Sequence, residues 1–219
     1  MTRGAALLSM FSIAIAACGD NQRPPSSAPP PGDAPTAADA PSADAPEVHG
    51  PFLAYRDPVA GALRLIRNAA STPTTIVLDL VVGDTALTGY STGFDLPLAP
   101  DKVTLADFAP GAALSAGTEP VAAKALIRAN DRPGRDLLVA GQSQKASGLG
   151  AVTTDTLLPP TTVLYTIRLT VRDPFVPGVV FDGTAADFVL PSGGLRNKLG
   201  QTIVEPGGVG IGKLEAQAR

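Results

Sequence analysis

The stretch TTVLYTIRLTVR, residues 161–172, has the clearest pattern in the sequence, because apolar and polar side chains alternate along its length. One set of alternate positions is entirely apolar and consists of Val163, Tyr165, Ile167, Leu169 and Val171. The other set is threonine and arginine, with Leu164 as the exception. Successive side chains of a β-strand point to opposite faces of the sheet, so this alternation predicts a half-buried strand.

A second segment, residues 75–82, repeats the alternation. The positions expected to face the core are Ile76, Leu78, Leu80 and Val82. Asp79 then lies on the outward face, and so do Val77 and Val81. Exposed aliphatic side chains on a sheet face indicate either a protein-binding patch or a covering loop. Both interpretations stay open for the outward aliphatic residues of the predicted strands: Val77, Val81, Leu126 and Leu164.

Further strands are predicted on both sides of these two segments. Residues 87–96 place Tyr90, Phe94 and Leu96 inward, with Gly89 and Gly93 interpreted as bulges. Weaker patterns predict strands at residues 63–67, 103–108, 122–129, 136–143, 187–190 and 209–214. Turn-forming residues at 130–134 and 197–200 predict a hairpin loop and a second turn.

The composition favours an all-β fold. The chain has 23 Gly and 22 Pro, and one or the other interrupts every window that could form an amphipathic helix. Eight or nine short strands separated by turns predict an antiparallel β-sandwich of the jelly-roll type over residues 51–219. That length is sufficient for one well-buried core.

The order of these segments also resembles a known family. The alternating strand at residues 76–82 precedes an aromatic strand that ends near Asp95, followed by Val103-Thr104-Leu105 and by Gly111 with Leu114. The hairpin at 125–140, the strand at 161–171 and the turn at 197–200 complete the series. This spacing resembles the cohesin domain over residues 62–214, and it is similar to carbohydrate-binding modules of the related jelly-roll type. The resemblance implies a sandwich that binds a partner; no individual binding residue is carried over, and residues 144–160 depart from the family as a longer loop-like insertion.

Residues 1–17 are organised as a lipoprotein signal peptide. Arg3 precedes an apolar run at residues 5–15, which is too short to span a bilayer. The sequence Ile15-Ala16-Ala17-Cys18 then resembles the bacterial lipobox, and it contains the only cysteine in the chain. We therefore expect cleavage before Cys18 and lipidation of its thiol and amino groups, because several acyl chains anchor a protein stably. Gly19 favours the outer membrane, with the domain on its periplasmic or surface side.

Residues 18–50 are predicted to be a disordered tether after the lipidated cysteine. From residue 19 onward this stretch holds eight of the 22 prolines and no aromatic residue, and Asp-Ala-Pro recurs at residues 33–35, 39–41 and 44–46. Such a chain cannot bury enough apolar area to fold. As an extended polyproline II segment at about 3.1 Å per residue, it could hold the domain up to roughly 90 Å from the membrane.

Few residues in the chain support catalysis or metal binding. The single histidine, His49, lies at the end of the tether, so a catalytic triad is not expected. Three groups of acidic residues are candidates: Glu119, Glu205 and Glu215 for glycoside hydrolysis, and Asp131 with Asp136 or Asp182 with Asp187 for calcium. None of them forms a motif, so we expect no enzyme activity, no metal and no cofactor. The net charge of −3 also argues against nucleic acid as a partner.

The sequence thus favours a non-enzymatic module that is anchored to the membrane through its N-terminal lipid and binds another surface protein. The alternative is a carbohydrate-binding module, or an accessory domain of a polysaccharide-degrading system. Sugar platforms use exposed aromatic rings, and the chain has no tryptophan. Tyr90 and Tyr165 are predicted to face the core, which leaves Tyr55 as the tyrosine with the most freedom.

The first testable prediction concerns the anchor. Cys18→Ser removes the only thiol that can be acylated, so we expect the protein to stay uncleaved by the lipoprotein signal peptidase and unlabelled by a palmitate analogue in cells. As a matched control, Ser26→Cys in the Cys18→Ser background restores a thiol outside the lipobox and should not restore labelling. Undiminished labelling of the Cys18→Ser protein would contradict the prediction.

Overall fold

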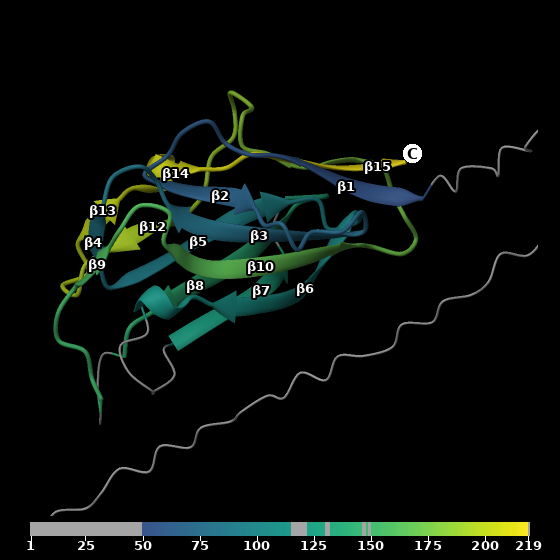
Figure 1. The fold of residues 1–219 in the computed structure, drawn as a ribbon. Coiled ribbons are helices and arrows are strands. Elements are labelled where there is room, and N and C mark those ends of the chain that lie inside the picture. The colour runs from purple at the N-terminus through teal and green to yellow at the C-terminus, as the bar shows by residue number, and fades with distance from the viewer. Residues whose placement is uncertain (1–49, 115–121, 130–131, 146–147, 149, 219) are drawn as a thin grey trace, which may run out of the picture. The chain divides into compact units, whose positions relative to one another are not determined.

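The computed structural model describes residues 50–114, 122–129, 132–145, 148 and 150–218. All regular structure in this part of the chain is β-strand, apart from two single-turn 3₁₀ helices, η1 (Ala112–Leu114) and η2 (Pro206–Gly208). The predicted all-β class is therefore confirmed (Figure 1). Cys18 and His49, and the signal peptide and tether with them, lie outside the described residues.

Two five-stranded sheets make up most of the domain. In the first sheet the strand order is β14 (Val209–Gly210), β2 (Leu63–Arg67), β3 (Thr75–Val82), β10 (Val163–Val171) and β6 (Val103–Pro110). In the second sheet the order is β13 (Thr202–Val204), β12 (Gly193–Arg196), β5 (Ser91–Leu98), β8 (Asp136–Ser143) and β7 (Ala122–Ala129). The chain passes repeatedly between the sheets, so strands distant in sequence become neighbours. All pairs are antiparallel except β14 with β2. The sequence predicted only antiparallel pairing, so this parallel pair is a difference from the prediction.

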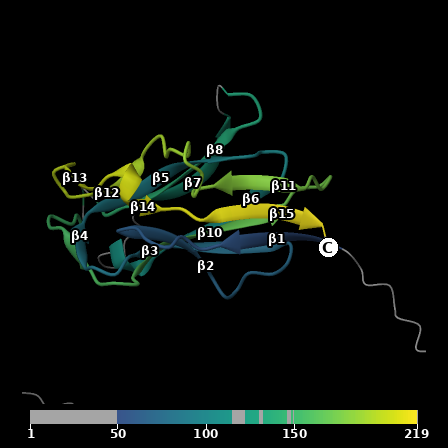
Figure 2. The ribbon, with the colours of Figure 1, turned by 90° about the horizontal axis from the view of Figure 1, so that it is seen from above.

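Two smaller sheets complete the fold. The first contains β1 (Pro51–Arg56), β15 (Lys213–Ala218) and β11 (Gly178–Asp182), with β15 in the middle. Backbone hydrogen bonds from Leu53 N to Pro73 O (2.7 Å) and from Ala99 N to Val180 O (2.9 Å) join this sheet to both large sheets. Seen from above in Figure 2, its strands lie side by side in the order β1, β15, β11. The second pairs β4 (Leu87–Gly89) with β9 (Thr156–Leu158).

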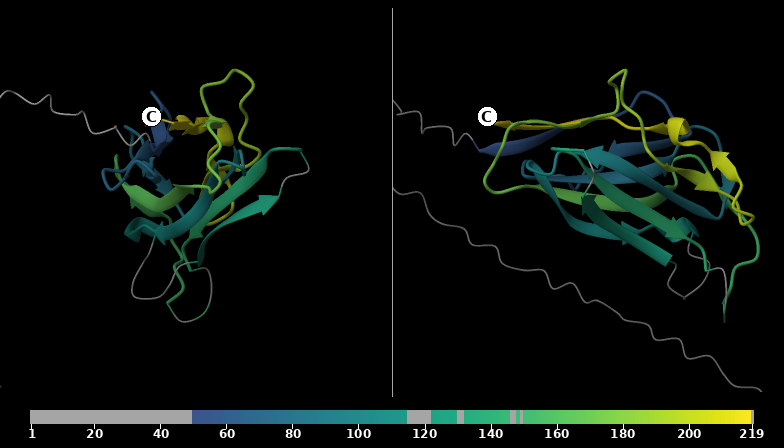
Figure 3. Two further views of the ribbon diagram at one scale, coloured as in Figure 1. Left: turned by 90° about the vertical axis from the view of Figure 1, so that its right-hand side faces the viewer. Right: turned by 180° about the vertical axis from the view of Figure 1, so that it is seen from behind.

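The two large sheets pack face to face around one hydrophobic core, as the views in Figure 3 show. Tyr165 on β10 marks the contact between them: its ring centroid lies 5.8 Å from that of Phe94 on β5, in the opposite sheet. Phe108, on the neighbouring strand β6, lies 5.4 Å away on the other side. Because these rings come from both sheets, the domain is a sandwich with its core between the two layers.

Strand β10 confirms the alternation seen at residues 161–172. It pairs with β3 on one side and with β6 on the other. Ile167 is fully buried, whereas the adjacent Arg168 is exposed. The prediction was wrong at two positions: Leu164 is also fully buried, and Val163, which was expected to face the core, is 39% exposed. The register with β3 shifts between Val163 and Tyr165, and this bulge turns two consecutive side chains inward.

The predicted outward face of β3 is buried as well. Val77, Asp79 and Val81 are no more than 7% exposed. Ser71, from the loop between β2 and β3, accepts a hydrogen bond at Oγ from Val77 N (3.0 Å), so this loop continues the pairing beside β3. Because Val77 is buried, it does not belong to an exposed protein-binding patch.

Strand neighbours cover the rest of this face. Val81 lies between its paired residues Arg64 on β2 and Val163 on β10. Asp79 accepts hydrogen bonds from Asn68 Nδ2 and Thr166 Oγ1, both at 2.6 Å. A buried carboxylate needs such partners, since an unpaired one is very costly. Alternation alone cannot reveal a strand that is covered on both faces.

Several predicted strand boundaries were wrong. Residues 87–96 form two strands, because the chain at Tyr90 leaves the small sheet with β9 and joins the large sheet with β8. Residues 209–214 likewise divide between β14 and β15. No strand forms at residues 187–190, where Phe188 N instead closes a turn onto Ala185 O (3.1 Å). Strands β1, β11, β12 and β13 were missed, and β9 lies within the predicted loop-like insertion.

The second prediction tests the phase of β10. Ile167→Ala removes a fully buried side chain from between the sheets and should cost about 2–5 kcal/mol of unfolding free energy. Arg168→Ala, one residue further on, should change it by no more than about 0.5 kcal/mol because its side chain is exposed. Urea unfolding of both variants measures the contrast. Equal losses, or a larger loss for Arg168→Ala, would show that the strand has the opposite phase.

Candidate functional site

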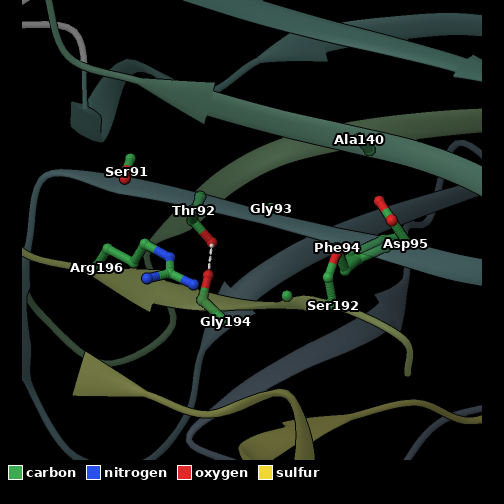
Figure 4. Close-up of a pocket in the computed structure, with 10 residues that line it drawn as sticks. Ser91, Thr92, Gly93, Phe94, Asp95, Ala140, Ser192, Gly194 and Arg196 are labelled. Atoms are coloured by element: carbon green, nitrogen blue, oxygen red, sulfur yellow. Dashed lines mark hydrogen bonds between the residues drawn. The ribbon is translucent and has the colours of Figure 1, made fainter. Parts of the chain in front are cut away.

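The outer face of the second sheet carries a row of three glycines on adjacent strands. Gly194 on β12 pairs with Gly93 on β5, and Gly93 pairs with Gly141 on β8. We call these three residues the glycine row. Since they carry no side chains, the sheet surface is lowered there, and a hollow of about 280 Å³ lies over Gly93 and Gly194 (Figure 4).

Local geometry explains why glycine occupies two of these positions. Gly194 has a φ of +109°, which side-chain-bearing residues rarely adopt. A Cβ on Gly93 would lie 2.8 Å from the carbonyl oxygen of Ala140. From the core side, Thr92 Oγ1 donates a hydrogen bond to Gly194 O (3.0 Å) and holds β12 against β5. The register at Gly93 is regular, so the predicted bulge is absent.

Polar and charged side chains flank the glycine row. Ser91 and Arg196, which pair with each other, line one side of the hollow, and Asp95 and Ser192 line the other. Figure 4 shows how these side chains lie around it. The Arg196 guanidinium donates a hydrogen bond to Gly200 O (3.0 Å), which holds it beside the hollow.

The face continues toward the free edge of the sheet at β7. Asp95 forms an ion pair with Arg128 on that strand (3.5 Å). The register places Leu126 beside Val139, and Lys124 beside Gly141 at the end of the glycine row. Leu126 is half-buried, so among the four aliphatic residues predicted to face outward it alone lies on an open sheet face. The surface therefore combines a smooth glycine floor with charged and aliphatic side chains.

The tyrosines provide no exposed aromatic platform. Tyr90 and Tyr165 are buried, as predicted. Tyr55 was expected to be the freest, but its hydroxyl donates to Leu65 O (2.7 Å) and accepts from Gly212 N (3.1 Å). Its ring lies 6.1 Å from that of Phe181, and burial raises the pKa of the Tyr55 phenol far above its usual value. Within the described residues, the exposed large hydrophobic side chains are all aliphatic: Val59, Leu157, Val163, Val179, Val189, Leu199 and Ile203.

The glutamates considered for hydrolysis do not converge on one site. Glu205 is exposed next to η2, and Glu215 lies on β15 in an ion pair with Lys213 (2.9 Å). The hydrogen bond from Lys213 lowers the pKa of the Glu215 carboxyl. Glu119 lies outside the described residues. The two carboxylates that can be placed therefore belong to different surface environments.

The aspartates that are candidates for calcium binding do not form a shared site either. Asp182 Oδ1 accepts hydrogen bonds from Thr184 N (2.9 Å) and Thr184 Oγ1 (2.6 Å), and the bond from the Thr184 hydroxyl is the main reason that the Asp182 pKa is lowered. Asp187 lies exposed in the turn that follows, and Asp131 is outside the described residues. In the part of the chain that the structure describes, no group of three His, Cys, Asp or Glu could hold a metal ion.

No helix among the described residues is long and apolar enough to cross a membrane. Comparison of the chain with protein-family models, with curated proteins and with solved structures found no match. The evidence on function is therefore the geometry of the domain itself. The sequence reasoning missed the glycine row because its members come from three strands whose pairing the sequence does not reveal. The sequence offered one signal for it: Gly93 and Gly141 lie at outward positions of the predicted strands 87–96 and 136–143.

The third prediction compares two tyrosine hydroxyls. Tyr55→Phe removes a hydroxyl together with both of its hydrogen bonds, so it should cost about 1–3 kcal/mol. Tyr165→Phe removes a hydroxyl that is fully buried and has no partner, and it should be neutral or stabilising. Thermal or urea unfolding of both variants tests this order. A larger loss for Tyr165→Phe would show that its hydroxyl has a partner, such as an internal water.

Proposed function

We propose that this chain is a bacterial lipoprotein whose sandwich domain binds another surface protein without catalysing a reaction. The binding surface is the outer face of the sheet β13-β12-β5-β8-β7. The observation that carries the proposal is the glycine row, bordered by the Asp95–Arg128 ion pair and by Arg196. Glycines within strands mark sites where a ligand or another backbone approaches closely.

The composition of this face suits a protein partner. Protein interfaces combine an apolar centre with a polar rim and are enriched in arginine. Leu126 and Val139 supply an aliphatic strip beside the glycine row, while Arg128 and Arg196 supply charge at its borders. A flat partner surface could therefore contact backbone, aliphatic and charged groups within one sheet face.

The carbohydrate-binding alternative has less support. Sugar rings stack on aromatic side chains, and among the described residues no aromatic side chain is more than partly exposed. Tyr55, Tyr90 and Tyr165 all direct their hydroxyls and rings into the domain. A polysaccharide would have to be held by hydrogen bonds alone, without the stacking that usually fixes its orientation.

The N-terminal region supports display of this domain outside the cytoplasm. Lipidation at Cys18 would anchor the chain to a membrane, which we propose to be the outer membrane, and residues 19–50 would act as an extended spacer. The resemblance to cohesin domains agrees with a binding role. A tethered module of this kind would bring a second protein to the membrane and keep it within the reach of the spacer.

The fourth prediction tests the glycine face. Ser91→Tyr fills the hollow with a bulky side chain at an outward strand position, whereas Thr104→Tyr makes the same kind of change on the exposed side of β6 in the other sheet. The mature chain carrying Cys18→Ser is immobilised and used to capture proteins from the envelope of the source cells. A captured partner should bind Ser91→Tyr at least about tenfold more weakly, because the contact surface is blocked. Thr104→Tyr should bind it normally.

Two outcomes would contradict the proposal. Equal binding by both tyrosine variants would place the partner on another surface. Binding to glycans on an array, without any protein captured, would favour the carbohydrate-binding alternative instead. Folding of each variant is checked by its urea midpoint, so that a loss of binding is not confused with unfolding.

A further inference from the structure

A second hollow lies further along the face that carries the glycine row. It has a volume of about 490 Å³, and it is formed by the end of β5, the start of β8, the loop before β8 and the segment after β11. We call it the arginine hollow. Its lining residues are Pro97, Arg132, Arg135, Leu137, Asp187, Val189 and Pro191.

The two arginines of this hollow are not engaged in ion pairs within the described residues. Arg132 is exposed and Arg135 is half-buried, and their contact is a backbone hydrogen bond from Arg135 N to Arg132 O (3.3 Å). Arg128 lies beside Leu137 in the register of β7 and β8, so it stands next to the same hollow. The hairpin of residues 122–143 carries Lys124 and three arginines against Asp131 and Asp136, a net charge of +2 within a domain whose acids and bases are equal in number. Arg128 is paired with Asp95, which leaves Arg132 and Arg135 as the arginines open to a ligand.

The remaining walls restrict what can bind there. Leu137 is almost completely buried in the wall, and Val189, at 68% exposure, stands open to solvent with Pro97 and Pro191 nearby. Asp187 adds one negative charge to the lining. The negative charge of Asp187 repels a dense polyanion or a phosphate dianion. A single carboxylate can still be held by the guanidinium groups of the two arginines. The apolar wall then suits an aliphatic side chain next to that carboxylate.

We propose that the arginine hollow binds an acidic, extended peptide segment of the protein partner, in which a Glu or Asp carboxylate meets Arg132 and Arg135 while a neighbouring aliphatic side chain contacts Leu137 and Val189. This inference deepens the proposed function and rests on it, because the hollow lies on the same sheet face as the glycine row. Pairing of a carboxylate with two guanidinium groups fixes both the position and the direction of the segment.

The test uses the mature chain carrying Cys18→Ser and a short fluorescein-labelled peptide in which glutamate alternates with leucine. Fluorescence anisotropy should show binding that weakens as salt is added, since the charges are near the surface. Arg132→Gln and Arg135→Gln should each weaken binding by about tenfold, the usual effect of losing a charged hydrogen bond. Arg67→Gln, an exposed arginine on β2 in the other sheet, should leave binding unchanged.

Control peptides define the chemistry of the ligand. Replacing glutamate by glutamine in the peptide should abolish binding, and replacing leucine by glycine should weaken it. Binding of a fluorescein-labelled oligoguluronate that depends on both arginines, with no binding of the acidic peptide, would overturn the peptide assignment in favour of an acidic polysaccharide. Equal affinity of Arg67→Gln and Arg132→Gln for the peptide would overturn the site.

The proposed function and this inference can fail separately. If Ser91→Tyr abolishes capture of an envelope protein but neither arginine substitution does, the glycine face binds protein and the arginine hollow takes no part. If the acidic peptide binds through Arg132 and Arg135 but no envelope protein depends on Ser91, the hollow is a peptide site and the wider face is not the docking surface.

Discussion

The packing of Tyr165 between the two large sheets is the contact on which the domain depends. Its ring reaches Phe94 across the layers and Phe108 within its own sheet. The bulge at Leu164 adds a second buried side chain at the same point, so this end of β10 fills more of the core than simple alternation allows. With β10 fixed in this way, β3 and β6 take their registers from it, and the first sheet is defined.

The position of the candidate binding face follows from that arrangement. Phe94 points inward to meet Tyr165, so its neighbours on β5, Gly93 and Asp95, must point outward. The pairing of β5 with β8 and β12 then brings Gly141 and Gly194 beside Gly93. The same alternation that buries aromatic rings in the core therefore leaves the outer face with glycine, serine and charge. Phe94 and Tyr165 are thus used in the core and cannot form a sugar platform on this face.

The sequence predicted much of the fold but little of the candidate site. Residues 63–67, 75–82, 122–129 and 136–143 form strands with the predicted bounds, because each is a short periodic run between turn residues. Burial of Val77 and Val81 could not be predicted, since a neighbouring loop and neighbouring strands are tertiary features. The failure at Tyr55 has a similar cause: its partners, Leu65 O and Gly212 N, are backbone groups of other strands and junctions that only the tertiary fold brings to it. The glycine row and the arginine hollow both combine residues from separate strands, and one sequence contains no signal for that pairing.

The pairing of the first and last strands has a mechanical consequence. Pro51 lies opposite Ala218 in the antiparallel pair of β1 and β15, so the segment that precedes residue 50 enters the domain at the outer end of this pair. If a bound partner is pulled away from an anchored chain, the tension is transmitted through β1. Tension along the strand axis loads all of its hydrogen bonds with β15 together instead of opening them one at a time. The Tyr55 hydroxyl adds connections to Leu65 and Gly212, so the force spreads into β2 and the junction before β15. The first strand of the domain is thus held in a geometry that resists stretching along its own axis.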